Sequence, residues 1–146
     1  MLVPAAQACM RVSGIPASFT LAQAALESGW GAKAPGCNLF GIKADKSWKG
    51  AVTLVPTHEV LKGVRVAITD KFRCYATYDE ALTDRAKFFR DNPRYAKCFK
   101  ETTGEGWARA VALAGYATDP KYADSLIAVM KGRNMAQYDI LPPTKG

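Results

Sequence analysis

The sequence predicts a single α+β domain that is mainly helical, with a small β-lobe inserted between two groups of helices. Apolar residues recur at helical spacing before residue 30 and again after residue 78. Between residues 51 and 75 they instead alternate with other residues, which is typical of half-buried strands. A length of 146 residues suits one domain with a core of its own.

The first part of the chain is predicted to form two helices. Residues 3–13 carry small apolar side chains at helical spacing, and Ser13-Gly14 would end that helix. Pro16 suits the first turn of a second helix, because its fixed φ matches the helical value. This helix would end at Gly29 and Gly31, and its apolar side chains are Phe19, Ala22, Ala25 and Leu26.

The β-lobe is predicted from two alternating patterns, and residues 57–63 would connect its strands as a loop or hairpin end. The alternating residues are Val52 and Leu54, followed by Val64, Val66 and Ile68.

Helices return after residue 78. Asp79 is the expected N-cap of a helix that ends before Pro93. A second helix is predicted over residues 104–115, and Asp119-Pro120 would open a third, because proline is favoured in the first helical turn.

The domain is expected to span residues 1–137, followed by an extended C-terminal tail over residues 138–146. The start of the chain makes a poor secretory signal, since no basic residue precedes Arg11 and Pro4 interrupts the segment. No apolar stretch approaches the roughly 20 residues that cross a bilayer, so we expect no transmembrane segment.

The formal net charge is +7, and the basic excess is spread over both halves of the chain. Such a field favours polyanionic partners, among them nucleic acid, anionic lipid and acidic cell-wall polymer. No helix-turn-helix, zinc-finger or ribonucleoprotein motif is present, so we expect no nucleic-acid partner.

The chain has four widely spaced cysteines and a single histidine, His58. This composition predicts neither a metal site nor another cofactor. We expect reduced thiols, and an oxidising compartment would allow three pairings of Cys9, Cys37, Cys74 and Cys98.

Glu27 is the leading candidate for a catalytic residue. It lies one helical turn after Gln23, in the last turn of the second predicted helix. Burial and the negative end of the helix dipole both disfavour an ionised carboxylate, so its pKa is expected to be raised. A carboxylic acid that keeps its proton near neutral pH is what general acid catalysis requires. The alternative interpretation is a solvated glutamate at a helix end.

Glu59 offers a second carboxylate at the tip of the predicted β-lobe. A helical body facing a β-lobe forms a cleft, and two acids across a cleft are the minimal equipment for glycoside hydrolysis. Tyr116 adds a hydroxyl just before a predicted helix cap. Aromatic side chains in neighbouring loops could stack on sugar faces; they are Trp30, Phe40, Trp48, Tyr75 and Tyr78.

Six blocks of the sequence resemble the bacterial glucosaminidase domains of glycoside hydrolase family 73. The first block is Leu21-Ala22-Gln23-Ala24-Ala25-Leu26-Glu27-Ser28-Gly29-Trp30-Gly31, which closely resembles the family's motif. The other blocks are 38–43, 57–59, 72–75, 92–95 and 115–123. They follow the family's order and cover most of residues 15–130, which makes the match specific.

The resemblance implies roles for individual residues. Glu27 corresponds to the family's catalytic acid, and Glu59 to an acidic residue of the β-lobe that acts as base or assists the substrate's acetamido group. Tyr116 corresponds to a tyrosine close to the catalytic acid. Phe40, Tyr75 and Tyr78 correspond to positions near the sugar-binding groove, and we add Trp30 and Asn38 as substrate contacts. For Trp30, packing beneath the end of the helix is an equal alternative.

The resemblance also implies a lysozyme-like fold, in which the β-lobe forms one wall of a cleft. The implied activity is that of an endo-β-N-acetylglucosaminidase, which cuts the glycan strand of peptidoglycan without a metal or cofactor. A muramidase cut by the same site, a catalytically silent cell-wall-binding module and a basic nucleic-acid-binding protein are the alternatives.

We expect a monomeric phage or prophage lysis enzyme. It would stay in the cytoplasm of the host cell until lysis and then act at the periplasm and cell wall. Its positive charge would help it to reach an anionic bacterial envelope. An exported host autolysin is the alternative.

Overall fold

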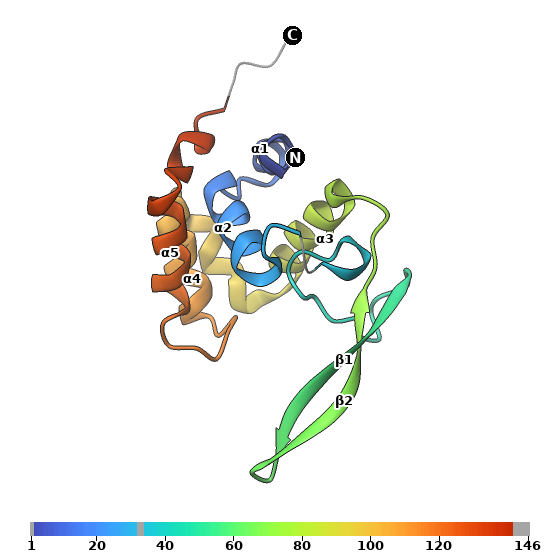
Figure 1. The fold of residues 1–146 in the computed structure, drawn as a ribbon. Coiled ribbons are helices and arrows are strands. Elements are labelled where there is room, and N and C mark those ends of the chain that lie inside the picture. The colour runs from blue at the N-terminus through green and yellow to red at the C-terminus, as the bar shows by residue number, and fades with distance from the viewer. Residues whose placement is uncertain (1, 32–33, 142–146) are drawn as a thin grey trace.

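The helices gather into one body, and a β-hairpin projects from it (Figure 1). The computed structural model describes residues 2–31 and 34–141, with the side chain of Glu59 excepted. The helices are α1 (Leu2–Ser13), α2 (Ala17–Ser28), α3 (Tyr78–Asp91), α4 (Gly104–Leu113) and α5 (Tyr122–Gly132). The strands are β1 (Val52–Leu61) and β2 (Val64–Arg73), and the 3-10 segments are η1 (Pro35–Cys37), η2 (Pro93–Lys100) and η3 (Met135–Asp139).

Helix α2 is the central element of the body. Every residue from Ala17 to Ala24 is buried, since α2 contacts α1, α4, α5 and η3. Its last turn leaves the core, and Leu26, one of the apolar side chains named above, is 41% exposed. The site described below lies at this surface end of α2.

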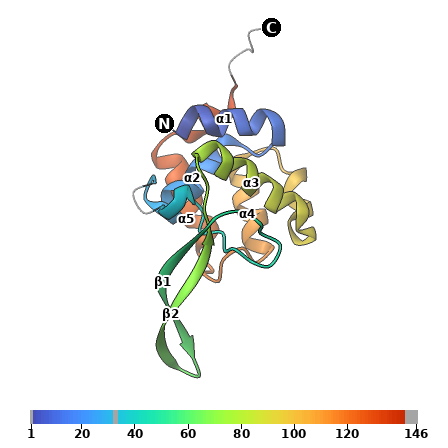
Figure 2. The ribbon, with the colours of Figure 1, turned by 90° about the vertical axis from the view of Figure 1, so that its right-hand side faces the viewer.

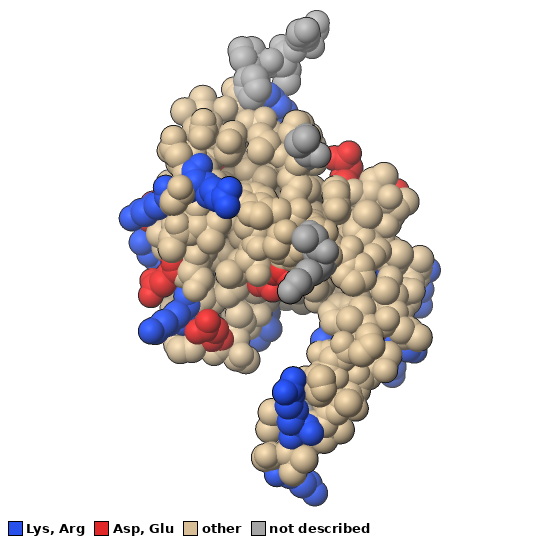
Figure 3. All heavy atoms as spheres, viewed as in Figure 1, with Lys and Arg blue, Asp and Glu red and all other residues tan. Residues whose placement is uncertain are grey.

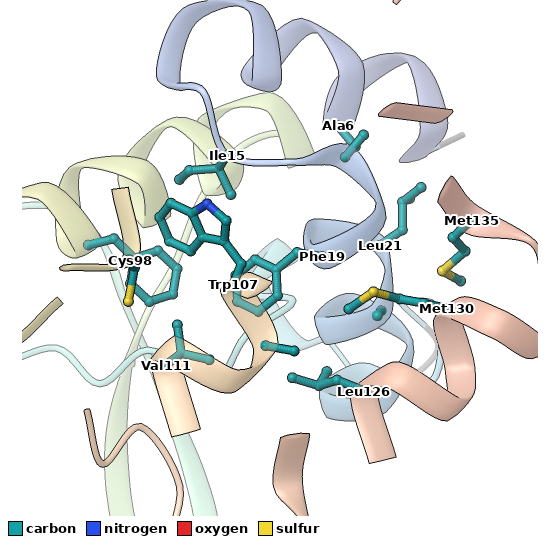
Figure 4. Close-up of a cluster of buried hydrophobic side chains, with 14 of the residues drawn as sticks. Ala6, Ile15, Phe19, Leu21, Cys98, Trp107, Val111, Leu126, Met130 and Met135 are labelled. Carbon is teal, nitrogen blue, oxygen red and sulfur yellow. The ribbon is translucent and has the colours of Figure 1, made fainter. Parts of the chain in front are cut away.

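Aromatic side chains join α2 to its neighbours in the core (Figure 4). The ring of Trp107 from α4 lies 5.5 Å from that of Phe19 and 5.8 Å from that of Phe89, measured between centroids. All three side chains are fully buried. Tilted and edge-on aromatic pairs at such distances add stability beyond the area they bury, so α2, α3 and α4 form a firm base for the site.

The β-lobe is a two-stranded antiparallel hairpin that extends away from the helices in both ribbon views (Figures 1 and 2). The register runs from Val52 opposite Arg73 to Leu61 opposite Val64. Only Lys62 and Gly63 form the turn, and their φ values of 50° and 77° are those of a two-residue hairpin turn. Residues 57–61, expected in a loop, therefore belong to β1.

The base of the hairpin is tied to α3 through Asp84. The carboxylate of Asp84 accepts a hydrogen bond from Nη1 of Arg73 at 2.9 Å and another from Oη of Tyr75 at 2.5 Å. Nε of Arg73 also donates to the backbone carbonyl of Lys43 at 3.1 Å. These partly buried contacts hold the last residues of β2 against the helical body.

Two helices begin elsewhere than predicted. Helix α3 begins at Tyr78 with Thr77 as its N-cap, because the Thr77 side chain accepts a hydrogen bond from the N–H of Glu80 at 3.2 Å. Helix α5 begins at Tyr122. Asp119 caps the preceding turn, where its carboxylate accepts from the N–H of Lys121 at 2.9 Å.

The folded chain continues past the boundary predicted at residue 137, because η3 extends to Asp139. The Asp139 carboxylate accepts hydrogen bonds from the backbone N–H and the hydroxyl of Ser18, at 2.7 and 2.5 Å. It thereby satisfies one of the free N–H groups at the start of α2. Residues 142–146 of the predicted tail lie outside the described residues.

In the described part of the chain, no helix combines the length and the apolar character that a bilayer crossing requires. Each of the four cysteines is a free thiol in this structure.

Candidate active site

Glu27 lies where the end of α2 faces the base of the hairpin. It lines a cavity of about 170 Å³ together with Val55 and Phe72 from the two strands. The segment between α2 and β1 completes the wall with Pro35, Asn38 and Gly41. The face between the helical body and the hairpin is concave in the space-filling view (Figure 3). The predicted cleft between helices and β-lobe is thus present, and Glu27 is part of its lining.

The backbone after Glu27 explains why α2 stops at this point. Gly29, Trp30 and Gly31 all have positive φ, at 57°, 64° and 92°. The N–H of Gly31 donates to the Ser28 hydroxyl at 3.0 Å, and that hydroxyl donates to the Ala24 carbonyl at 2.6 Å. Left-handed conformations end a helix sharply, so Glu27 is fixed in the final turn at the rim of the cleft.

The environment of Glu27 favours its protonated form. The residue keeps exposed surface toward the cleft, yet burial of its carboxyl raises its pKa above the ordinary glutamate value. A hydrogen bond from Oη of Tyr122 to Oε1 of Glu27, at 3.0 Å, opposes this shift in pKa and is the smaller effect. The negative end of the α2 dipole acts in the same direction as burial. A raised pKa is one of the properties that a general acid requires.

Glu59 does not lie at a loop tip but within β1, where its backbone is opposite Val66 of β2. Its side chain lies outside the described part of the structure. Along β1 it is four residues beyond Val55, which lines the Glu27 cavity. At roughly 3.3 Å per residue, the two backbones are separated by about 13 Å along the strand.

Tyr116 lies close to the acid but is not its hydrogen-bond donor. Its ring stacks on that of Tyr122, with centroids 5.7 Å apart and planes 21° apart. Burial, with the nearby Glu27 charge as a smaller effect, raises the pKa of Tyr116. Burial, together with Tyr116 and Glu27, raises the pKa of Tyr122 as well. Both phenols therefore stay protonated across the physiological range, and Tyr122 is the one that contacts Glu27.

Trp30 and Tyr78 lie beside the end of α2. Trp30 is 42% exposed, and the guanidinium of Arg133 lies 5.4 Å from the centroid of its ring. The hydroxyl of half-buried Tyr78 approaches Gly31 so closely that a Cβ at that position would lie 2.9 Å from it. Among the predicted sugar contacts, Trp30 exposes the most aromatic surface.

The other predicted sugar contacts are largely buried. Asn38 donates to the carbonyls of Ile42 and Arg73 at 2.8 and 3.0 Å, and thereby holds the loop beside Glu27. Phe40 is 4% exposed, and the hydroxyl of Tyr75 donates a hydrogen bond to the carboxylate of Asp84. The structure thus places Asn38 in the cavity wall and gives Phe40 and Tyr75 packing roles that shape it.

Sequence reasoning missed three residues around Glu27, namely Gln23, Arg85 and Tyr122. Gln23 precedes Glu27 by one helical turn, and Tyr122 lies within a block of the family resemblance, so both carried a signal in the sequence. Arg85 carried none, because a lone arginine in an amphipathic helix is ordinarily exposed. Within residues 2–31 and 34–141, no cluster of histidine, cysteine, aspartate or glutamate is arranged to hold a metal ion.

The chain belongs to the glucosaminidase family. Residues 3–135 match the family described as mannosyl-glycoprotein endo-beta-N-acetylglucosaminidase. The family membership that the sequence motifs predicted is therefore confirmed.

Individual relatives agree with this assignment. The chain is 45% identical over 126 residues to the peptidoglycan hydrolase FlgJ of Salmonella typhimurium, which covers 82% of this chain and 40% of FlgJ. It is 39% identical over 135 residues to the exo-glucosaminidase LytG of Bacillus subtilis, covering 87% of this chain and 47% of LytG. The chain thus spans less than half the length of these two relatives.

The fold is also that of a solved relative. A C-terminally truncated glycoside hydrolase domain of Salmonella typhimurium FlgJ matches with a TM-score of 0.77 and 42% identity, covering 91% of this chain and 93% of that domain. The shared region is therefore nearly the whole of a glycoside hydrolase domain, and the predicted lysozyme-like class with its β-lobe is confirmed.

Proposed function

We propose that this chain hydrolyses the glycan strand of peptidoglycan, as an endo-β-N-acetylglucosaminidase, with Glu27 as the general acid. The observation that carries the proposal is a carboxyl with a raised pKa in the wall of a cleft between two lobes. A proton on Glu27 would pass to the bridging oxygen as its bond to the sugar carbon breaks. The charge left on the sugar ring must then be stabilised from the opposite side.

We infer that Glu59 or the substrate's own 2-acetamido oxygen provides that stabilisation. The acetamido group is already attached to the reacting sugar, and Glu59 lies in β1, the strand that also contributes Val55 to the cavity wall. Tyr116 would support the site through its stacking on Tyr122.

We further propose that sugars contact the exposed ring of Trp30 and the edge of Tyr78. Asn38, Phe40 and Tyr75 would shape the cleft from within its wall. This assignment follows from exposure, because a stacking platform needs a free aromatic face. The Arg133 guanidinium already lies over the Trp30 ring, so a sugar would use the opposite face.

Glu27→Gln tests the proposal. Gln cannot donate an acid proton, so hydrolysis of purified cell walls should fall by at least about 100-fold, the usual contribution of general acid catalysis. Glu59→Gln should reduce the rate of hydrolysis by less than Glu27→Gln does if the acetamido group participates. Turbidity loss of a wall suspension measures the rate, and co-sedimentation with walls measures binding.

Retained binding with lost hydrolysis is the expected pattern for Glu27→Gln. Wall binding by a parent protein that releases no sugar ends would indicate a silent binding module instead. Full activity of Glu27→Gln would contradict the proposal. Analysis of the reducing ends in the digest distinguishes a glucosaminidase cut from a muramidase cut at the same site.

We also propose that the protein is a monomeric phage or prophage lysis enzyme, which stays in the cytoplasm until lysis and then reaches the wall. The net charge of +7 supports attraction to an anionic envelope. Lysis that requires a co-expressed membrane-permeabilising protein would support this role. A gene located among flagellar genes would contradict it and favour an exported autolysin.

A further inference from the structure

Arg85 of α3 is a fully buried cation that forms no ion pair with any described carboxylate. The rings of Phe40, Phe19 and Phe89 surround its guanidinium, with centroids 4.5, 5.0 and 5.0 Å away. Burial lowers the pKa of Arg85 to about 10, so it remains charged at neutral pH. In such a low-dielectric site, the hydrogen bonds that it donates strongly polarise their acceptors.

Arg85 fixes the orientation of the Gln23 amide. Nε and Nη2 of Arg85 both donate to Oε1 of Gln23, at 3.0 and 2.7 Å. A flipped amide would place its NH₂ group against the guanidinium, so that orientation is excluded. Nη1 of Arg85 donates to Thr20 at 3.0 Å and holds the guanidinium in place. The NH₂ group of Gln23 must therefore point toward the active site.

Two further hydrogen bonds, donated in the same direction, lead from Gln23 to Glu27. Nε2 of Gln23 donates to Oη of Tyr122 at 2.9 Å, and Tyr122 donates its own proton to Oε1 of Glu27 at 3.0 Å. Because Oε1 accepts this bond, the proton of neutral Glu27 resides on Oε2. Thr20, Gln23 and Glu27 share one face of α2, since they are spaced by three and four residues.

We propose that Arg85, Gln23 and Tyr122 are positioning residues, which form a hydrogen-bond chain of fixed direction that holds Oε1 of Glu27 as an acceptor and confines the transferable proton to Oε2. The proposal rests on the proposed role of Glu27 as general acid. When the Oε2–H bond breaks, the bridging oxygen gains the proton and the sugar carbon loses its bond to that oxygen. The same chain then stabilises the carboxylate that remains.

Among the side chains that the structure describes, few other titratable groups face Glu27. Tyr116 from the segment before α5 stacks on Tyr122 and is coupled to Glu27 by charge. The strands contribute the uncharged Val55 and Phe72 to the described lining. If removal of the Tyr122 hydroxyl shifts the titration of Glu27, the shift is therefore attributable to the hydrogen-bond chain.

Tyr122→Phe is the primary test, because it removes the donor and keeps the ring. Carbon-13 NMR of glutamate-labelled protein follows the carboxyl of Glu27, whose signal is identified by its absence in Glu27→Gln. Loss of one neutral hydrogen bond to the carboxylate should move the titration midpoint of Glu27 upward by about 0.5 to 1 pH unit. The alkaline limb of the rate profile should move by the same amount.

Tyr95→Phe is the matched control. Tyr95 is also buried, and its ring centroid lies 6.1 Å from that of Tyr116, yet it takes no part in the chain. It should shift the Glu27 midpoint by less than about 0.2 pH units, because no hydrogen bond to Glu27 is lost.

Gln23→Glu provides a second, isosteric variant. Its carboxylate keeps the two bonds from Arg85 but has no NH₂ group for Tyr122, and it adds a negative charge near Glu27. The Glu27 midpoint should therefore rise further than in Tyr122→Phe.

An unchanged titration midpoint of Glu27 in Tyr122→Phe, or an equal shift in Tyr95→Phe, would overturn the proposed role of the hydrogen-bond chain. In that event an inactive Glu27→Gln would still support Glu27 as the acid. An active Glu27→Gln would overturn the proposed function. The NMR titration would still report whether the hydrogen-bond chain shifts the pKa of the Glu27 carboxyl.

Discussion

Glu27 shows at the scale of one residue how a carboxyl that we propose to be catalytic can oppose folding. Its pKa is raised in the folded state, chiefly by burial. Such a group stabilises the fold fully below its unfolded pKa, near 4.3, and this stabilisation is lost as the pH rises through the folded pKa. Above the folded pKa, the ionised form of Glu27 therefore destabilises the fold.

Glu27→Gln should for this reason raise the melting temperature at pH 8. The increase should be only about one to a few degrees, because water screens the charge on the exposed side of the residue. The gain should vanish at pH 3, where the parent carboxyl is protonated in both states. Thermal unfolding at the two pH values measures it. Glu101→Gln, at an exposed loop residue, serves as control. A variant that is less stable than the parent at pH 8 would contradict the account.

The residue scale also shows what local sequence can and cannot predict. The position of Glu27 in a final helical turn was predictable, because capping and periodicity are local properties. The contact itself was not predictable from local sequence, since Tyr122 is separated from Glu27 by 95 positions and meets it only in the packed structure. The buried state of Arg85 depends likewise on rings from three separate segments.

At the scale of elements, one arginine joins the hairpin to the helical body. Arg73 contacts two acids that differ in environment. Asp84 lies 2.9 Å from Nη1 with 16% of its side chain exposed, whereas Asp45 lies 3.7 Å from Nη2 with 66% exposed. The pair offers a matched comparison, since both contacts involve the same guanidinium.

Asp84→Asn should lower the free energy of unfolding by about 2 to 3 kcal/mol, because it leaves a largely buried guanidinium without its counter-charge and weakens the Tyr75 contact. Asp45→Asn should cost less than about 0.5 kcal/mol, as exposed ion pairs contribute little. Urea unfolding measures both. Amide exchange should also become faster at the base of β2 in Asp84→Asn but not in Asp45→Asn. Equal effects of the two variants would contradict the role of the Arg73–Asp84 contact in holding the hairpin against the helical body.

Element existence was more predictable than element extent. The hairpin was evident from alternation, but the strands continue to Leu61 because Lys62 and Gly63 alone close the turn. Phe40 and Tyr75 resembled groove residues in sequence, since a loop pattern does not reveal which aromatic side chains turn inward. Turn geometry decided the extent of the strands, whereas tertiary packing, which no local pattern encodes, decided the burial of Phe40 and Tyr75.

At the scale of the whole molecule, family membership and fold followed from the order of several motifs, none of which was decisive alone. The charge is also a property of the whole chain. Lysines and arginines occur on both the helical body and the hairpin (Figure 3), and the net charge is +7. Such a distributed field acts on approach to a polyanion over distances comparable with the Debye length.

Salt should therefore slow hydrolysis of intact walls more than hydrolysis of a soluble, uncharged oligomer of N-acetylglucosamine. Between about 50 and 500 mM NaCl, the Debye length falls from roughly 14 to 4 Å, and we expect about a tenfold loss of rate on walls. The rate on the neutral oligomer should change by less than about twofold, since Glu27 chemistry in the cleft is short-range. Initial rates of reducing-end release measure both reactions. Equal salt dependence on the two substrates would show that the positive field takes no part in reaching the wall.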